Sequence, residues 1–184
     1  PNLSTNLLKD LLISTLELVE SLTSFPETID FVIAFDGANF VIPLCLTDDE
    51  NITSRAFHLI NNILSKSKPT ESFVQNYLSQ FANFTFRSSS SEALQPLVIL
   101  THLVKTPEFI AFFVDNTEAI SAFSLYLESE DETVLGFALR LTFSLISSTK
   151  MPANFSTLGK QLVTCLSSPN PSISIMAAAC LISI

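Results

Sequence analysis

The sequence predicts an all-α protein built from repeated helical units. It contains only three glycines in 184 residues, and no alternating Val/Ile/Thr segment bounded by a tight turn appears, so the usual signals of strands and hairpins are missing. In several segments apolar residues recur at positions i, i+4, i+7 and i+11, which places them along one stripe of a helix. These stripes recur at a nearly constant spacing. Since a single repeat cannot bury its own stripe, neighbouring repeats must stack and share a core.

The stripe that begins at Ile52 shows the repeat most clearly. Two successive steps of 41 residues, and a further step of 39, give apolar residues at every position. A step of 41 residues in the opposite direction does the same, except at Thr15. One such match could arise by chance in an apolar sequence, but four in one register indicate a structural repeat. The members are Leu11, Thr15, Leu18 and Leu22; Ile52, Ala56, Leu59 and Ile63; Ala93, Leu97, Leu100 and Val104; Val134, Ala138, Leu141 and Leu145; and Ile173, Ala177, Cys180 and Ile184.

Two further helices are expected upstream of each stripe. A second ladder contains Leu46, Phe86, Leu127 and Leu166. It is preceded by Gly37, Asn76, Asn116 and Asn154, residue types that enter the left-handed backbone region at low cost, so we expect a sharp corner there. Short first helices are predicted still earlier, over residues 28–35, 71–75 and 107–114. Each complete unit is therefore interpreted as a short helix, a corner, a second helix, a loop and a long helix.

This unit of about 40 residues resembles the armadillo repeat. The Gly corner in residues 35–38, the apolar pair in residues 44–46 and the small Ala within residues 56–63 occur in the order of that family. The two-helix HEAT repeat has a similar length and is the alternative, although it lacks a regular Gly or Asn corner. The resemblance implies a right-handed α-solenoid, with one domain over residues 1–184. Its parts would be a partial repeat at residues 1–25 and repeats at about 26–67, 68–106, 107–149 and 150–184.

Composition and charge limit the kinds of partner that the protein is expected to bind and the cellular compartment in which it is expected. A net charge of −9 with nine Lys and Arg residues disfavours nucleic acid and anionic lipid. No apolar run reaches the roughly 18 residues that a membrane span needs, so we expect no membrane insertion. Three cysteines without a CxxC pair make no disulfide framework and fit a eukaryotic cytoplasmic or nuclear protein. The sequence starts with Pro1 rather than Met, and its last residues are apolar, so we interpret it as a fragment of a longer chain.

No catalytic, metal or cofactor site is predicted. His58 and His102 stand 44 residues apart, at positions that are not equivalent in the repeat, so they should not form a metal pair. Gly159-Lys160 lacks both the preceding glycine and the following Ser or Thr of a phosphate-binding loop. We therefore expect no enzymatic activity and no bound cofactor.

By the resemblance, the long third helices should line a concave groove that holds an extended peptide or partner segment. Three apolar residues, Ile99, Leu103 and Phe137, are expected as anchors, with Arg55 and Arg140 orienting acidic groups. Alternatively, the repeat that contains Pro96 is rotated, and Ile99 and Leu103 belong to the core. Receptors of nuclear-import signals use repeated Trp and Asn in this groove, whereas here Trp is absent. The candidate groove residues are Arg55, His58, Asn62, Ile99, Leu103, Phe137, Arg140 and Ser144.

We therefore expect a scaffold or adaptor domain that binds a protein or peptide segment in its groove. The alternative is the regulatory or autoinhibitory arm of a larger protein, for example a kinase, a cytoskeletal regulator or a chaperone exchange factor. The sequence leaves the partner and the oligomeric state open.

Overall fold

The computed structural model describes residues 3–34, 36–85, 90–148 and 157–184, and in these ranges the regular structure is entirely helical. The chain divides into two compact units, residues 1–77 and residues 78–184. The division falls inside one helix, α5 (Glu71–Thr85). Five helices, α1, α4, α6, α9 and α11, carry the apolar stripes and are called the stripe helices below.

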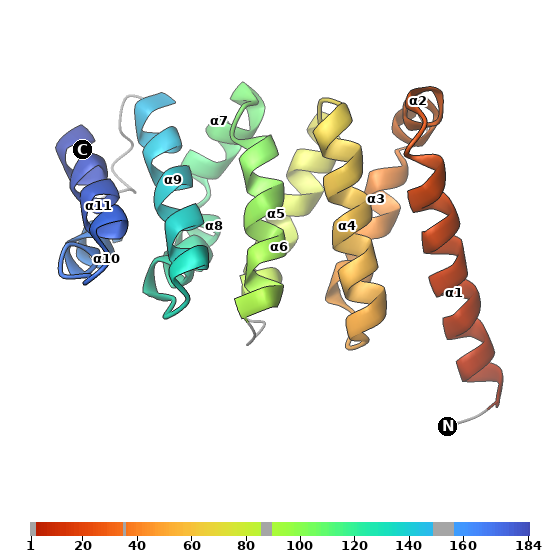
Figure 1. Cartoon of the computed structure of the whole chain (residues 1–184). Coiled ribbons are helices and arrows are strands. Elements are labelled where there is room, and N and C mark those ends of the chain that lie inside the picture. Colours follow the sequence, from red (N-terminus) through yellow and green to blue (C-terminus); the bar gives the residue numbers. More distant parts are fainter. Residues whose placement is uncertain (1–2, 35, 86–89, 149–156) are drawn as a thin grey trace. The chain divides into compact units, whose positions relative to one another are not determined.

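In the first unit, α4 lies between its neighbours and forms the centre of the packing. It contacts α1 along one side and η1, α3 and α2 along another (Figure 1). The bounds are Leu3–Leu22 for α1, Pro26–Ala34 for α2, Gly37–Val41 for α3, Ile42–Leu46 for η1 and Glu50–Lys66 for α4.

Local chemistry fixes the start of α4. The carboxylate of Asp49 accepts hydrogen bonds from the backbone N–H groups of Asn51 at 3.1 Å and Ile52 at 3.3 Å. These groups have no partner within the helix, so the side chain caps it. The helix then buries Ile52, Leu59 and the other members of its stripe. Asp49, in the acidic sequence Asp48-Asp49-Glu50, is thus the cap of α4, where the helix dipole favours a carboxylate.

The corner before α3 differs from the prediction. Asp36, and not Gly37, takes the left-handed conformation, with φ 54° and ψ 31°. Its carboxylate accepts hydrogen bonds from Asn39 Nδ2 at 2.6 Å and Ser72 Oγ at 3.2 Å, which hold the residue in place. Gly37 is needed for a different reason, because a Cβ atom there would lie 2.9 Å from both the side chain and the carbonyl oxygen of Val32. The glycine permits close packing, and Asp36 turns the chain.

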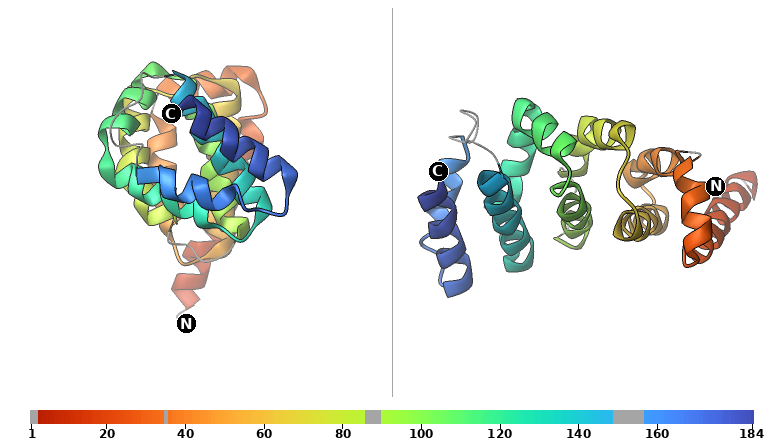
Figure 2. Two further views of the ribbon diagram at one scale, coloured as in Figure 1. Left: turned by 90° about the vertical axis from the view of Figure 1, so that its left-hand side faces the viewer. Right: turned by 90° about the horizontal axis from the view of Figure 1, so that it is seen from above.

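In the second unit, α9 occupies the central position. It contacts α11, α6 and η2, while α10 packs against α11, and Figure 2 shows α9 and α11 side by side. The bounds are Ser90–Leu103 for α6, Pro107–Asp115 for α7, Thr117–Ser124 for α8, Leu125–Glu128 for η2, Glu132–Ser148 for α9, Gly159–Cys165 for α10 and Pro171–Ser183 for α11.

Aromatic rings fill the interior of the second unit. Phe113 contacts Phe123 edge to face with 5.7 Å between ring centroids, and Phe81 lies 5.9 Å from Tyr126. Phe123 and Tyr126 are 6.3 Å apart. All four side chains are buried. Such pairs add to the free energy gained by burying large apolar surfaces, which explains part of the use of sixteen phenylalanines.

The structure differs among the other three residues at which a corner was predicted. Asn76 lies inside the continuous helix α5, so the short helix expected at residues 71–75 and the corner after it do not form. Asn116 does mark a corner, but its backbone is extended, and its Oδ1 caps α8 by accepting a hydrogen bond from the N–H of Ala119 at 2.9 Å. Asn154 lies outside the described residues.

On α4, α9 and α11 the stripe register agrees with the structure. Ile52, Val134 and Ile173 are all buried, and Ala56 and Ala138 on the same stripes have no exposed surface. On α1 the equivalent residues Leu11 and Leu18 are exposed. Because equivalent positions on α4, α9 and α11 share one environment, the sequence period is a structural repeat and not a coincidence of composition.

Candidate functional site

In the first unit two of the predicted groove residues, Arg55 and Asn62, bond to residues in or directly after α1. Arg55 forms an ion pair with Glu17, with 2.6 Å between Nη2 and Oε1, and thereby links α4 to α1. Asn62 Nδ2 donates a hydrogen bond to the Thr23 hydroxyl at 2.8 Å. His58 is exposed on the same helix. Arg55 thus joins α4 to α1, and Asn62 joins α4 to the turn that follows α1. The Arg55 charge is already paired with Glu17.

On α6 the groove prediction is wrong. Ile99 and Leu103 are both 0% exposed, so they belong to the core and cannot anchor a partner. The physical reason is that residues 94–103 are apolar around most of the helix, and such a helix is buried on more than one face. Leu97 and Leu100 of the predicted stripe are buried as well. The alternative interpretation, that Ile99 and Leu103 are core residues, is correct.

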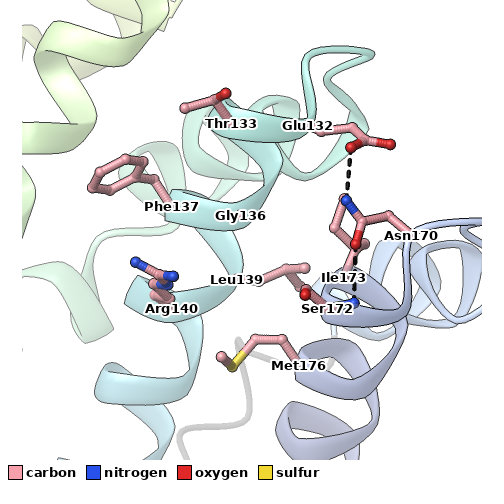
Figure 3. A pocket seen from close by; sticks show the side chains of 10 residues that line it. All are labelled: Glu132, Thr133, Gly136, Phe137, Leu139, Arg140, Asn170, Ser172, Ile173 and Met176. Atoms are coloured by element: carbon pink, nitrogen blue, oxygen red, sulfur yellow. Dashed lines mark hydrogen bonds between the residues drawn. The ribbon is translucent and has the colours of Figure 1, made fainter.

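A hollow of about 230 Å³ opens between α9 and the start of α11 in the second unit (Figure 3). It combines apolar, cationic, anionic and amide groups on two stripe helices. The lining residues are Glu132, Thr133, Gly136, Phe137, Leu139, Arg140, Asn170, Ser172, Ile173 and Met176.

Phe137 and Arg140 line this hollow from α9, where Arg140 is exposed and Phe137 is partly buried. The guanidinium carbon of Arg140 lies 6.0 Å from the centroid of the Phe137 ring, within the range of a cation–π interaction. Both side chains project from the same side of α9 (Figure 3). Within the described ranges no carboxylate forms an ion pair with Arg140. The ring therefore orients the cation while its charge stays available.

The opposite wall is fixed by Asn170. Its Nδ2 donates a hydrogen bond to Glu132 Oε2 at 2.7 Å, which joins the start of α11 to the start of α9. Its Oδ1 accepts from the N–H of Ser172 at 3.0 Å and so caps α11. Both ends of the Asn170 amide are thus bonded, and Glu132 lies at the rim of the hollow.

Gly136 contributes open main chain to the hollow. A Cβ atom built at this residue would meet nothing within 4 Å, so packing does not require a glycine. Glycine inside a helix lowers its stability by about 0.5–1 kcal/mol relative to alanine. The apolar pattern of the sequence does not indicate Gly136 or Asn170 as site residues. A glycine within an otherwise regular helical pattern was the available signal, since such a residue often permits close approach of another group.

Ser144 lies one turn beyond Arg140 and does not line the hollow. Its hydroxyl donates a hydrogen bond to the carbonyl oxygen of Arg140 at 3.0 Å, within its own helix. Of the predicted groove residues, the structure therefore brings Phe137 and Arg140 together in one site and leaves Ser144 at its edge.

The environments of Cys165 and Cys180 disfavour the thiolate form. Burial raises the pKa of Cys165, and burial together with repulsion from Cys165 raises the pKa of Cys180 to about 11. A thiol with a raised pKa is a poor nucleophile at neutral pH.

The described residues contain no group of three or more His, Cys, Asp or Glu that could hold a metal ion. No single helix among them is long and apolar enough to cross a membrane; one sharply bent pair, residues 26–33 with 37–46, meets the criteria of length and composition.

Comparison with known proteins gives matches in structure alone. No protein-family model and no curated protein matches the sequence. The crystal structure of an engineered protein matches with a TM-score of 0.69 and 16% identity, over 93% of this chain and 72% of that one. A computationally designed armadillo repeat protein for modular peptide recognition matches with a TM-score of 0.68 and 15% identity, over 95% of this chain and 81% of that one.

The chain has an armadillo-like repeat fold. The predicted fold class, an all-α solenoid of armadillo-like repeats, is confirmed. The hollow lies between two stripe helices of this fold, α9 and α11.

Proposed function

We propose that the protein is a non-enzymatic interaction module, acting as a scaffold or adaptor, which binds a peptide or protein segment in the hollow between α9 and α11. The observation that carries the proposal is the contrast between two arginines that were both expected to face the groove, Arg55 on α4 and Arg140 on α9. Arg55 is neutralised by Glu17. Arg140 stacks on Phe137 and has no carboxylate partner in the described part of the chain.

The chemistry of the hollow favours an extended segment with an acidic group. Arg140 would pair with a carboxylate, and Phe137 and Met176 would contact an adjacent apolar side chain. Gly136 would let the main chain of the segment approach closely. A similar designed protein was made for modular peptide recognition, and this supports the proposal. The three cysteines are free thiols, which supports a cytoplasmic or nuclear location.

The test is selection of ligands from a displayed library of random peptides, followed by titration of labelled peptides in a fluorescence anisotropy assay. Phe137→Ala and Arg140→Ala should each weaken binding by about tenfold, the loss usual for a residue near the centre of an interface. Phe143→Ala is the matched control, because Phe143 lies on the same helix, is 37% exposed and does not line the hollow. Thermal unfolding should show that all three variants remain folded. Equal affinities for all variants would contradict the site.

A further inference from the structure

The hollow between α9 and α11 carries opposite charges at different points along its length. Glu132 stands at the start of α9, and Arg140 lies two helical turns later on the same helix. With a rise of about 1.5 Å per residue, the two positions are about 12 Å apart along the helix axis. Both side chains are exposed, and Figure 3 shows Glu132 toward the top of the hollow and Arg140 lower down. The hollow is therefore polarised along α9.

Neither charge is neutralised within the described part of the chain. The ion pairs found there lie in the first unit, and they include neither Glu132 nor Arg140. Glu132 accepts a hydrogen bond from the neutral amide of Asn170 at 2.7 Å, and Arg140 lies over the neutral ring of Phe137. Each contact orients a charge without cancelling it, so both charges can meet a ligand.

Between these charges α9 offers an apolar side chain and open main chain. Phe137 is half-buried, so part of its ring can contact a ligand. At Gly136 a Cβ atom would meet nothing within 4 Å, so another main chain can approach there. The volume of the hollow, about 230 Å³, is below the roughly 300–1,000 Å³ of small-molecule sites. It thus suits side chains of a polypeptide that continues outside it.

We propose that the hollow selects a segment of a partner protein with a Lys or Arg, an apolar residue and an Asp or Glu at alternate positions, i, i+2 and i+4, in either chain direction. The inference rests on the proposed function, because it concerns the same hollow. Alternate residues of an extended chain point to the same side, and four residues span about 13 Å, close to the separation of the two charges. The cation pairs with Glu132, the acidic group with Arg140, and the apolar residue contacts Phe137.

The same charges disfavour other classes of ligand. A free amino acid carries its ammonium and carboxylate groups on one carbon atom, too close together to reach both Glu132 and Arg140. A phosphate group or a nucleic acid would meet the carboxylate of Glu132 at the rim, and the net charge of −9 adds to the repulsion. A uniformly acidic segment satisfies Arg140 alone. A polypeptide with separated charges of both signs satisfies both residues.

The first experiment compares peptides of identical composition by fluorescence anisotropy at low salt. One contains Lys-Thr-Leu-Thr-Glu, one has this order reversed to cover the opposite chain direction, and one contains Thr-Leu-Thr-Lys-Glu; all have the same Gly-Ser flanks. The spaced peptide, in one of its two directions, should bind about tenfold more tightly than the peptide with adjacent charges. Equal affinities would overturn the proposal. The comparison uses the unaltered protein, so it does not depend on the folding of a variant.

Charge reversal at residue 132 tests a change of preference and not merely a loss. Glu132→Lys should bind a peptide with Glu at both charged positions better than the spaced Lys–Glu peptide, whereas the unaltered protein should show the opposite order. Glu132→Gln keeps an oxygen that can accept from Asn170 and should lower the affinity for the spaced peptide by about fivefold. Glu130→Lys is the matched control, because Glu130 is exposed and does not line the hollow. It makes the same change in net charge and should leave the preference as it is.

These outcomes separate the charge pattern from the proposed function. If Phe137→Ala and Arg140→Ala weaken the binding of library-selected peptides while Glu132→Lys leaves the preference unchanged, the hollow binds a segment but the charge pattern is wrong. If none of the three substitutions alters binding, the proposed function fails as well. Sedimentation of the protein alone tests for a second copy as the occupant. A dimer that Glu132→Lys dissociates would contradict the assignment to a partner protein.

Discussion

Arg140 lies over the ring of Phe137, with 6.0 Å between the guanidinium carbon and the ring centroid. The two residues are three positions apart on α9, so the helix itself places them on one face. This contact holds a cation at the edge of the hollow without neutralising it. The carboxylate of Glu17 orients Arg55 and neutralises its charge. The Phe137 ring orients Arg140 but leaves its charge free to meet a ligand.

The first prediction concerns the charge at residue 140. Arg140→Gln should lower the affinity for a selected acidic peptide by about five- to tenfold, because about 1 kcal/mol is typical of a partly exposed charge-assisted contact. Arg140→Lys should retain part of that affinity, since it keeps the charge but not the planar stacking on Phe137. Titrations at low and high salt measure both effects. Arg55→Gln is the control and should leave affinity unchanged, and an equal loss there would place the ligand elsewhere.

The second prediction compares two glycines. Gly136→Ala should raise the free energy of unfolding by about 0.5–1 kcal/mol, because the new methyl group meets nothing within 4 Å and alanine favours the helix. Gly37→Ala should lower it, because the added Cβ would lie 2.9 Å from the Val32 carbonyl oxygen. Urea denaturation of the two variants measures both changes. If Gly136→Ala destabilises the protein, the hollow is not open at that residue.

The same position tests the hollow as a binding site. Gly136→Leu should abolish peptide binding because its side chain would occupy the space between α9 and α11. The alanine variant should bind more tightly than the leucine variant, since it fills much less of the hollow. Anisotropy titrations with one selected peptide make the comparison. Unchanged affinity of the leucine variant would show that the segment does not enter the hollow.

The third prediction concerns the dependence of stability on pH. The hydrogen bond from Lys9, assisted by the N–H groups of Ile52 and Asn51, lowers the pKa of Asp49 below its ordinary value of 3.8. A carboxyl group whose pKa is lower in the folded state stabilises the fold above its unfolded pKa. That contribution is lost as the pH falls through the lowered pKa. Chemical denaturation at several pH values between about 2 and 6 should show the loss.

Asp49→Asn is the appropriate variant for this experiment. Asparagine caps a helix about as well as aspartate, so α4 should remain intact while the interaction with Lys9 is lost. The variant should therefore show a flatter profile of stability against pH in the acidic range. Lys9→Gln removes the partner of Asp49 and should flatten the profile of stability against pH in the same way. A profile that both substitutions leave unchanged would mean that other carboxylates govern acid unfolding.

Sequence analysis predicted the burial of Ile52, Val134 and Ile173 because a stripe of period 3.6 must face something apolar. It could not decide which side of α6 is covered, because residues 94–103 are apolar around most of the helix. Periodicity then gives no preferred face, and Ile99 and Leu103 were misplaced. The hollow was found only in part, since its shape depends on the separation of α9 and α11. That separation is set by tertiary contacts such as the one between Asn170 and Glu132.

The last prediction concerns the buried hydroxyl of Tyr126. This oxygen has no hydrogen-bond partner among the described residues, and its ring packs between those of Phe81 and Phe123. Burial raises the pKa of the phenol, so the group stays neutral at all ordinary pH values. An unpaired buried hydroxyl costs about 1–3 kcal/mol of desolvation. Tyr126→Phe removes that cost while it preserves the ring contacts, so the free energy of unfolding should rise by about 1 kcal/mol in urea denaturation.

Phe123→Leu is the comparison, because it keeps an apolar side chain but loses the ring contacts with Phe113 and Tyr126 and should destabilise the second unit. A loss of stability in Tyr126→Phe would show that the hydroxyl has a partner that holds the aromatic core together.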